Sequence, residues 1–199
     1  MTKLDTSSIA DIDGEICLTF SEFRDSVRHH AKGFLALGLR KGSRVAVLMG
    51  NRVEWLTTYF ASVTIGAEVV ALNTLATARE LAYQLTHAEV DVLVFEPKYR
   101  DRDFVVILAD AAREHGLDPL PKYIPVDDVP PGAMSFTDLV EYGSRIDDDI
   151  LVAAQRAIEP GDTACILYTS GSTALPKGVP LYHSGLINNM WSIGERQHL

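Results

Sequence analysis

The sequence has few cysteines and no long apolar run, and each shortage excludes a class of protein. Its two cysteines, Cys17 and Cys165, lie far apart and outside any CxxC or CxxH context, which argues against structural zinc and against a disulfide framework. We therefore expect reduced thiols and a cytoplasmic location. No apolar stretch approaches the roughly 18 residues that a membrane span requires. The first residues lack a basic start followed by an apolar core, so no secretion signal is predicted.

The sequence also lacks an excess of basic residues. It carries 18 Lys and Arg against 27 Asp and Glu, a formal net charge of −9. Residues 61–162 hold 19 of the acidic and 8 of the basic residues, whereas residues 163–199 hold one acidic and two basic residues. An acidic surface repels nucleic acid, and no basic stripe interleaved with aromatics offsets it. We expect no nucleic-acid partner, but the late segment is permissive for an anionic ligand.

Length and hydropathy pattern predict one α/β domain or a large part of one. The 199 residues are 47% hydrophobic, which is enough for a core. Short apolar runs such as RVAVLM at 44–49 alternate with segments of helical period such as 21–37. Strands joined by helix-length crossovers pair in parallel beneath covering helices, so the prediction is a layered, doubly wound, mostly parallel sheet flanked by helices. Helices are expected at 21–37, 53–65, 77–88, 101–115, 136–142 and from 147, and strands at 44–49, 68–72, 91–96, 122–126 and 163–168.

The most informative stretch is ILYTSGSTALPKGVPLYH at 166–183, which places many hydroxyls and little bulk between two strand-like runs. Glycine lets main-chain N–H groups approach a ligand closely, and consecutive N–H groups in such a turn favour anions. Ser and Thr hydroxyls can rotate onto phosphate oxygens, and Lys177 adds a mobile positive charge. Composition alone is more typical of a flexible surface hairpin. The ordered string YTSGSTxxPKGV is more specific and favours a polyphosphate site.

Two other phosphate-binding loops do not fit this stretch. The Walker A pattern GxxxxGK[ST] requires a glycine before the lysine, and here Pro176 precedes Lys177. GxGxxG does not occur in the segment, so a Rossmann dinucleotide turn is not supported. A small-molecule kinase built on a Walker loop is therefore excluded.

YTSGSTALPKGV at 168–179 resembles the phosphate-binding signature of the adenylate-forming (AMP-binding) superfamily. LTFSEF at 18–23 and ARELAYQLTHAEVDVLV at 78–94 resemble the first part of such enzymes in order and spacing. The resemblance covers nearly the whole chain. It is nearest to the acyl-CoA synthetases, in GNRVEW at 50–55 and LNTLATARELAYQL at 72–85.

The resemblance implies an ATP-dependent acid–thiol ligase, of the kind that includes long-chain-fatty-acid-CoA ligases. A small carboxylic acid, expected to be a fatty or other lipophilic acid, attacks the α-phosphorus of ATP and releases pyrophosphate. The acyl-adenylate is then captured by coenzyme A, and Mg²⁺ neutralises phosphate charge. The implied phosphate-binding residues are Thr169, Ser170, Gly171, Ser172, Thr173, Ala174, Lys177 and Gly178.

Two departures from the family pattern bear on function. Ala174 stands where the signature has glycine, which costs roughly 1–2 kcal/mol if the backbone there is left-handed and almost nothing otherwise. The family's later motifs, its catalytic lysine and its C-terminal domain would follow Leu199. Residues 1–199 are thus expected to be the N-terminal portion of the large domain, inactive alone. A stand-alone, non-catalytic nucleotide- or partner-binding remnant is the alternative, and a homo-oligomer is left open.

Overall fold

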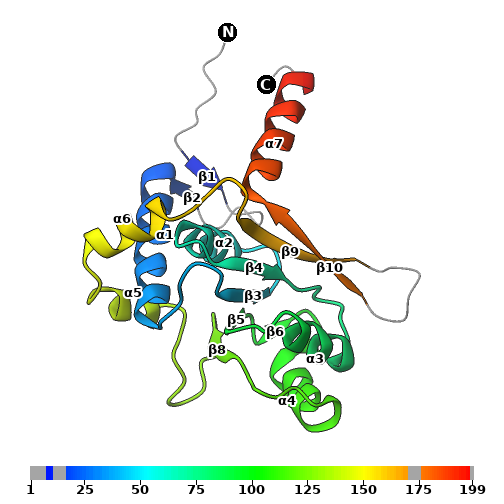
Figure 1. Cartoon of the computed structure of the whole chain (residues 1–199). Coiled ribbons are helices and arrows are strands. Elements are labelled where there is room, and N and C mark those ends of the chain that lie inside the picture. The colour runs from blue at the N-terminus through cyan, green and yellow to red at the C-terminus, as the bar shows by residue number, and fades with distance from the viewer. Residues whose placement is uncertain (1–7, 11–16, 170–175, 198–199) are drawn as a thin grey trace.

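A six-stranded sheet runs through the centre of the fold and joins segments that are far apart in sequence (Figure 1). The computed structural model describes residues 8–10, 17–169 and 176–197. The strands, in order across the sheet, are β10 (Lys177–Tyr182), β9 (Thr163–Thr169), β4 (Glu68–Ala71), β3 (Arg44–Leu48), β5 (Val92–Phe95) and β8 (Lys122–Pro125). Neighbours pair in parallel except β10, which is antiparallel to β9. The mostly parallel sheet is as predicted.

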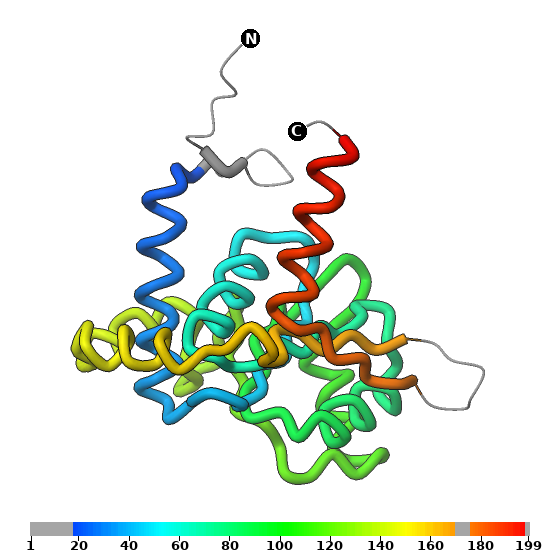
Figure 2. Tube along the Cα trace, turned by 45° about the horizontal axis from the view of Figure 1, so that its top comes forward, coloured from blue at the N-terminus to red at the C-terminus, as the bar shows by residue number. Residues whose placement is uncertain are grey.

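Helices cover both faces of this sheet. One face carries α1 (Phe20–Ala36), α2 (Val53–Thr64), α5 (Asp138–Gly143) and α6 (Asp148–Arg156), and the other carries α3 (Ala78–His87) and α4 (Phe104–His115). The chain passes from β3 through α2 to β4, then through α3 to β5 on the other side of β3. Because these crossovers lie on opposite faces, the sheet is doubly wound, as predicted. α7 (His183–Gln197) follows β10 and extends away from the sheet without burying a residue (Figure 2).

Alternate side chains of each strand enter different halves of the core. Val45 and Val47 of β3 pack with α1 and α2, whereas Ala46 and Leu48 pack with α3 and α4. All four are buried, as a strand covered on both faces requires. Among the helices of the described segments, none is both long and apolar enough to cross a bilayer.

Helix ends follow signals that are visible in the sequence. The Thr77 hydroxyl accepts a hydrogen bond from the main-chain N–H of Glu80 at 3.3 Å, and the Glu80 carboxylate accepts one from the main-chain N–H of Thr77 at 2.8 Å. This confirms the capping box before α3. Gly116 ends α4 in the left-handed region, with φ of 69°, which glycine adopts without a Cβ penalty.

Two short hairpins were not predicted. The helix expected from residue 101 begins at Phe104, because β6 (Lys98–Tyr99) and β7 (Arg102–Asp103) first pair antiparallel. Asp103 then caps α4, accepting a hydrogen bond from the main-chain N–H of Val106 at 3.1 Å. Near the N-terminus, β1 (Ser8–Ala10) pairs with β2 (Cys17–Thr19). Strands of two or three residues are too short to show a period of two.

α1 and α5 cross at a pair of glycines. A Cβ built on Gly33 would overlap the main-chain oxygen of Leu139, and a Cβ on Gly143 would lie 2.6 Å from the main-chain nitrogen of Gly33. Neither helix can yield locally, because both contacts are with main chain. The close crossing therefore depends on the absence of side chains at both positions.

We predict that Gly33→Ala lowers the free energy of unfolding by about 1–3 kcal/mol, because overpacking against rigid main chain outweighs the better helix propensity of alanine. Urea denaturation of the 199-residue chain measures the change. Gly161→Ala is the matched control, since a Cβ there meets nothing within 4 Å. Equal effects of the two substitutions would contradict the packing argument.

Candidate functional site

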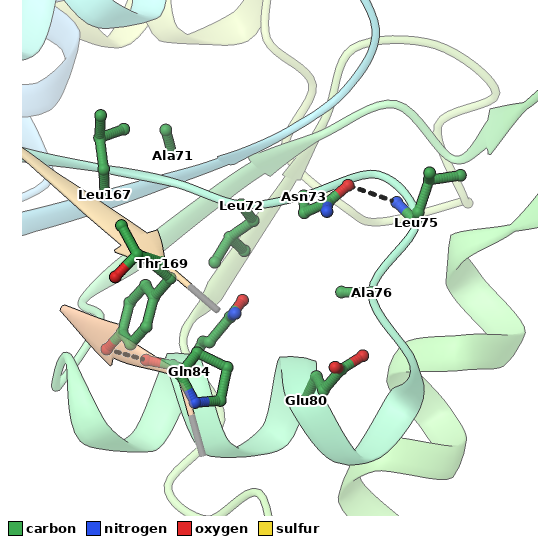
Figure 3. A pocket seen from close by; sticks show the side chains of 11 residues that line it. Ala71, Leu72, Asn73, Leu75, Ala76, Glu80, Gln84, Leu167 and Thr169 are labelled. Atoms are coloured by element: carbon green, nitrogen blue, oxygen red, sulfur yellow. Dashed lines mark hydrogen bonds between the residues drawn. The ribbon is translucent and has the colours of Figure 1, made fainter. Parts of the chain in front are cut away.

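A pocket of about 480 Å³ opens at the carboxyl ends of β4 and β9 (Figure 3). Residues 71–73 and 75–76 line it from the end of β4, and residues 167–169 line it from the end of β9. Glu80 and Gln84 of α3 form the opposite wall. Ligands of open α/β sheets bind outside the carboxyl ends of the strands, so this pocket is the candidate site.

The two stems of the predicted phosphate loop meet at this pocket. Thr169 and Lys177 are cross-strand neighbours in the antiparallel β9–β10 pair, and Thr169 lines the pocket. Lys177 is exposed, and no carboxylate of the described segments forms an ion pair with it. Its ammonium group is therefore available to an anionic ligand. The predicted residues Ser170, Gly171, Ser172, Thr173 and Ala174 lie outside the described residues.

Gly178 lies beside a neighbouring aromatic ring. It is the cross-strand neighbour of Tyr168, and a Cβ at Gly178 would lie 3.3 Å from Cγ2 of Ile166 and 3.5 Å from Cζ of Tyr168. The Tyr168 ring thus lies beside Gly178 of β10, where a Cβ would be in ordinary van der Waals contact with the ring and crowded against Ile166. The phosphate contact expected of Gly178 stays a prediction, and this packing role was missed.

The Tyr168 hydroxyl joins the end of β9 to α3. It donates a hydrogen bond to the main-chain oxygen of Gln84 at 3.3 Å, and it lies 2.9 Å from Nδ1 of His87. Burial raises the pKa of Tyr168 from 10.0 to about 12, so the phenol stays protonated at neutral pH. In the sequence, the one indication that Tyr168 belongs to the site is its place at the start of the signature string.

Gln84 and Glu80 supply the polar groups of the α3 wall. Gln84 is only 4% exposed, and its Oε1 has no hydrogen-bond partner in the part of the chain that the structure describes. Figure 3 shows its amide directed from α3 toward the strand ends. The Glu80 carboxylate is already held by the main-chain N–H and hydroxyl of Thr77, and these bonds lower the pKa of Glu80.

The described part of this site does not supply a metal centre. No group of three or more His, Cys, Asp or Glu side chains that could hold an ion occurs in the described residues. The carboxylate that lines the pocket, that of Glu80, is committed to the helix cap. We therefore assign no step to protein-bound Mg²⁺.

The doubly wound sheet places Thr169, at the end of β9, and Lys177, at the start of β10, at the edge where open α/β sheets bind their ligands. The chain belongs to the AMP-binding enzyme family, whose model matches residues 3–199. This confirms the resemblance drawn from the signature string.

Individual relatives agree with this membership. The acyl-CoA ligase sidI of Aspergillus fumigatus is 29% identical over 185 residues, which are 91% of this chain and 31% of that protein. The mitochondrial medium-chain acyl-CoA ligase ACSF2 of Bos taurus is 31% identical over 196 residues, 92% of this chain and 32% of that protein. The crystal structure of ATP-bound MatB from Rhodopseudomonas palustris has a TM-score of 0.71 at 30% identity, covering 97% of this chain and 35% of that one. The chain thus spans about a third of the length of these relatives.

The raised pKa of Tyr168 predicts a loss of stability at alkaline pH. Because the folded pKa of about 12 exceeds the unfolded value near 10, the contribution of Tyr168 is complete below about pH 10 and is lost as the pH rises toward 12. Burial also raises the pKa of Tyr59 and Tyr123, so the comparison is with Tyr168→Phe. Between about pH 10 and 12, the free energy of unfolding should decline less steeply with pH in Tyr168→Phe than in wild type. Equal slopes would refute the raised pKa of Tyr168.

Proposed function

We propose that the whole protein is an ATP-dependent acyl-CoA synthetase and that this chain supplies its site for the ATP phosphates. The observation that carries the proposal is that the two stems of the loop, joined by the Thr169–Lys177 pair, meet beside a pocket at the strand ends that Thr169 and Pro176 line. Residues 1–199 would form the first part of the large adenylate-forming domain. The proposed phosphate-binding set is Thr169, Ser170, Gly171, Ser172, Thr173, Ala174, Lys177 and Gly178.

The chemistry of these groups suits the stabilisation of a leaving pyrophosphate. Hydroxyl and main-chain N–H donors can bind the β- and γ-phosphate oxygens, and the Lys177 ammonium offsets their charge. Mg²⁺ would arrive with the nucleotide, because it binds through phosphates with few protein ligands. The acid would become an acyl-adenylate, and coenzyme A would accept the acyl group.

Substrate and location are further parts of the proposal, together with assembly. The names of the relatives, among them a medium-chain acyl-CoA ligase, support a lipophilic carboxylic acid without fixing its chain length. A cytoplasmic location stays a prediction from the cysteine pattern, and the Bos taurus relative is named as mitochondrial. A homo-oligomer likewise stays a prediction.

We predict that Lys177→Ala weakens the binding of ATP·Mg²⁺ to the 199-residue chain roughly tenfold or more, because a charge-assisted contact contributes about 1.5–3 kcal/mol. Isothermal titration calorimetry measures the Kd. Lys122→Ala is the charge-matched control, since Lys122 begins β8 at the opposite, amino end of the sheet. If Lys177→Ala bound ATP·Mg²⁺ as tightly as the control, the phosphate assignment would be wrong.

The 199-residue chain alone is expected to form no acyl-adenylate. Thr169, which lines the pocket, and its cross-strand neighbour Lys177 are both exposed, whereas adenylate formation needs a site from which water is excluded. Incubation with ATP, Mg²⁺ and decanoic acid, followed by assay for AMP and pyrophosphate, is the measurement. Turnover by the purified chain would overturn this expectation.

A further inference from the structure

β9 and β10 extend beyond the rest of the sheet as a two-stranded ribbon. Ala71, the last residue of β4, pairs with Leu167, so Tyr168 and Thr169 extend beyond the end of β4. On β10 they face Gly178 and Lys177. An isolated two-stranded ribbon is marginally stable in water. Its orientation must therefore be set by contacts outside the sheet.

Tyr168 provides those contacts through both its ring and its hydroxyl. The ring lies within van der Waals reach of the Cβ position of Gly178, so it borders β10 as well as β9. It also packs edge-on against Tyr83 and His87 of α3, with ring centroids 6.4 Å and 5.9 Å away. The hydroxyl bonds to His87 and to the main chain of Gln84. One side chain thus ties both strands of the ribbon to a helix that is anchored in the core.

Tyr168 lies next to the residues that are proposed to bind phosphate. The Tyr168–Gly178 pair is followed immediately by the Thr169–Lys177 pair, in which the proposed phosphate donors reside. A rotation of the ribbon about its junction with β4 would move the Thr169 hydroxyl and the Lys177 main chain together. Gln84, which lines the same pocket as Thr169, lies on the helix to which Tyr168 is bonded.

We infer that Tyr168 is a positioning residue: by joining β9 and β10 to α3 through His87 and Gln84, it fixes the orientation of Thr169 and Lys177 toward the phosphates. The inference rests on the proposed function of these two residues. Tyr168 itself contacts no phosphate in this assignment. Phenylalanine would retain the ring contacts and lose both hydrogen bonds, so it isolates the contribution of the hydroxyl.

The test uses the 199-residue chain and separates the hydroxyl from the ring. Tyr168→Phe should weaken ATP·Mg²⁺ binding roughly three- to tenfold, the effect of one or two lost hydrogen bonds. It should also shift the backbone amide NMR signals of Thr169 and Lys177. Tyr83→Phe is the matched control, because no hydrogen bond of the Tyr83 hydroxyl occurs within the described segments. This control should change neither quantity.

His87 variants test the partner of the hydroxyl. His87→Ala should move the Thr169 and Lys177 signals in the same direction as Tyr168→Phe. His87→Asn, whose amide lies near the position of Nδ1, should restore them toward wild type. A loss of stability without a change in Kd or in these signals would mean a merely structural role, and the inference would be wrong.

The two hypotheses fail in different ways. If the wild-type chain binds no ATP·Mg²⁺, the proposed function fails, and the amide signals alone then decide whether Tyr168 holds the ribbon. Unchanged signals in Tyr168→Phe overturn the inference. If wild type binds ATP·Mg²⁺ and Tyr168→Phe binds it equally well, the proposed function stands and the positioning role is rejected.

Discussion

β9 pairs in parallel with β4, from Cys165 opposite Val69 to Leu167 opposite Ala71, and the candidate site depends on this pairing. The two strands are separated by almost a hundred residues of sequence, so the contact carries the entropic cost of closing a long loop. Burial along the central strands offsets that cost, since β3 to β5 and the start of β9 are largely covered on both faces. Without this register the ends of β4 and β9 would not share a pocket.

α3 links this long-range contact to local structure. Its start is fixed by the capping box of Thr77 and Glu80, and its buried face packs on the sheet through Leu81 and Leu85. The helical turn between Leu81 and Leu85 presents Gln84 to the pocket. A helix whose position is set by its own cap and by the core can therefore serve as a fixed reference for the exposed ends of β9 and β10.

Much of the fold could be predicted because its signals are local. Helical periodicity, apolar runs and the Thr77–Glu80 pattern each depend on residues within a few positions of one another, and the structure confirms them. The place of β9 beside β4, and the meeting of Tyr168 with His87, depend on residues about eighty to a hundred positions apart, for which one sequence carries no pattern. The signature residues were found through the ordered string and its family resemblance, because composition alone is more typical of a plain hairpin.

The exposed helix α7 gives the protein an intrinsic optical reporter. Trp191 is one of two tryptophans in the chain and is 71% exposed on a helix that buries no residue. Its indole therefore emits from an aqueous environment, whereas Trp55 is partly buried against the core. Any surface that comes to cover α7 would transfer Trp191 to an apolar environment and shift its fluorescence to shorter wavelength, so that association at this helix can be followed without a label.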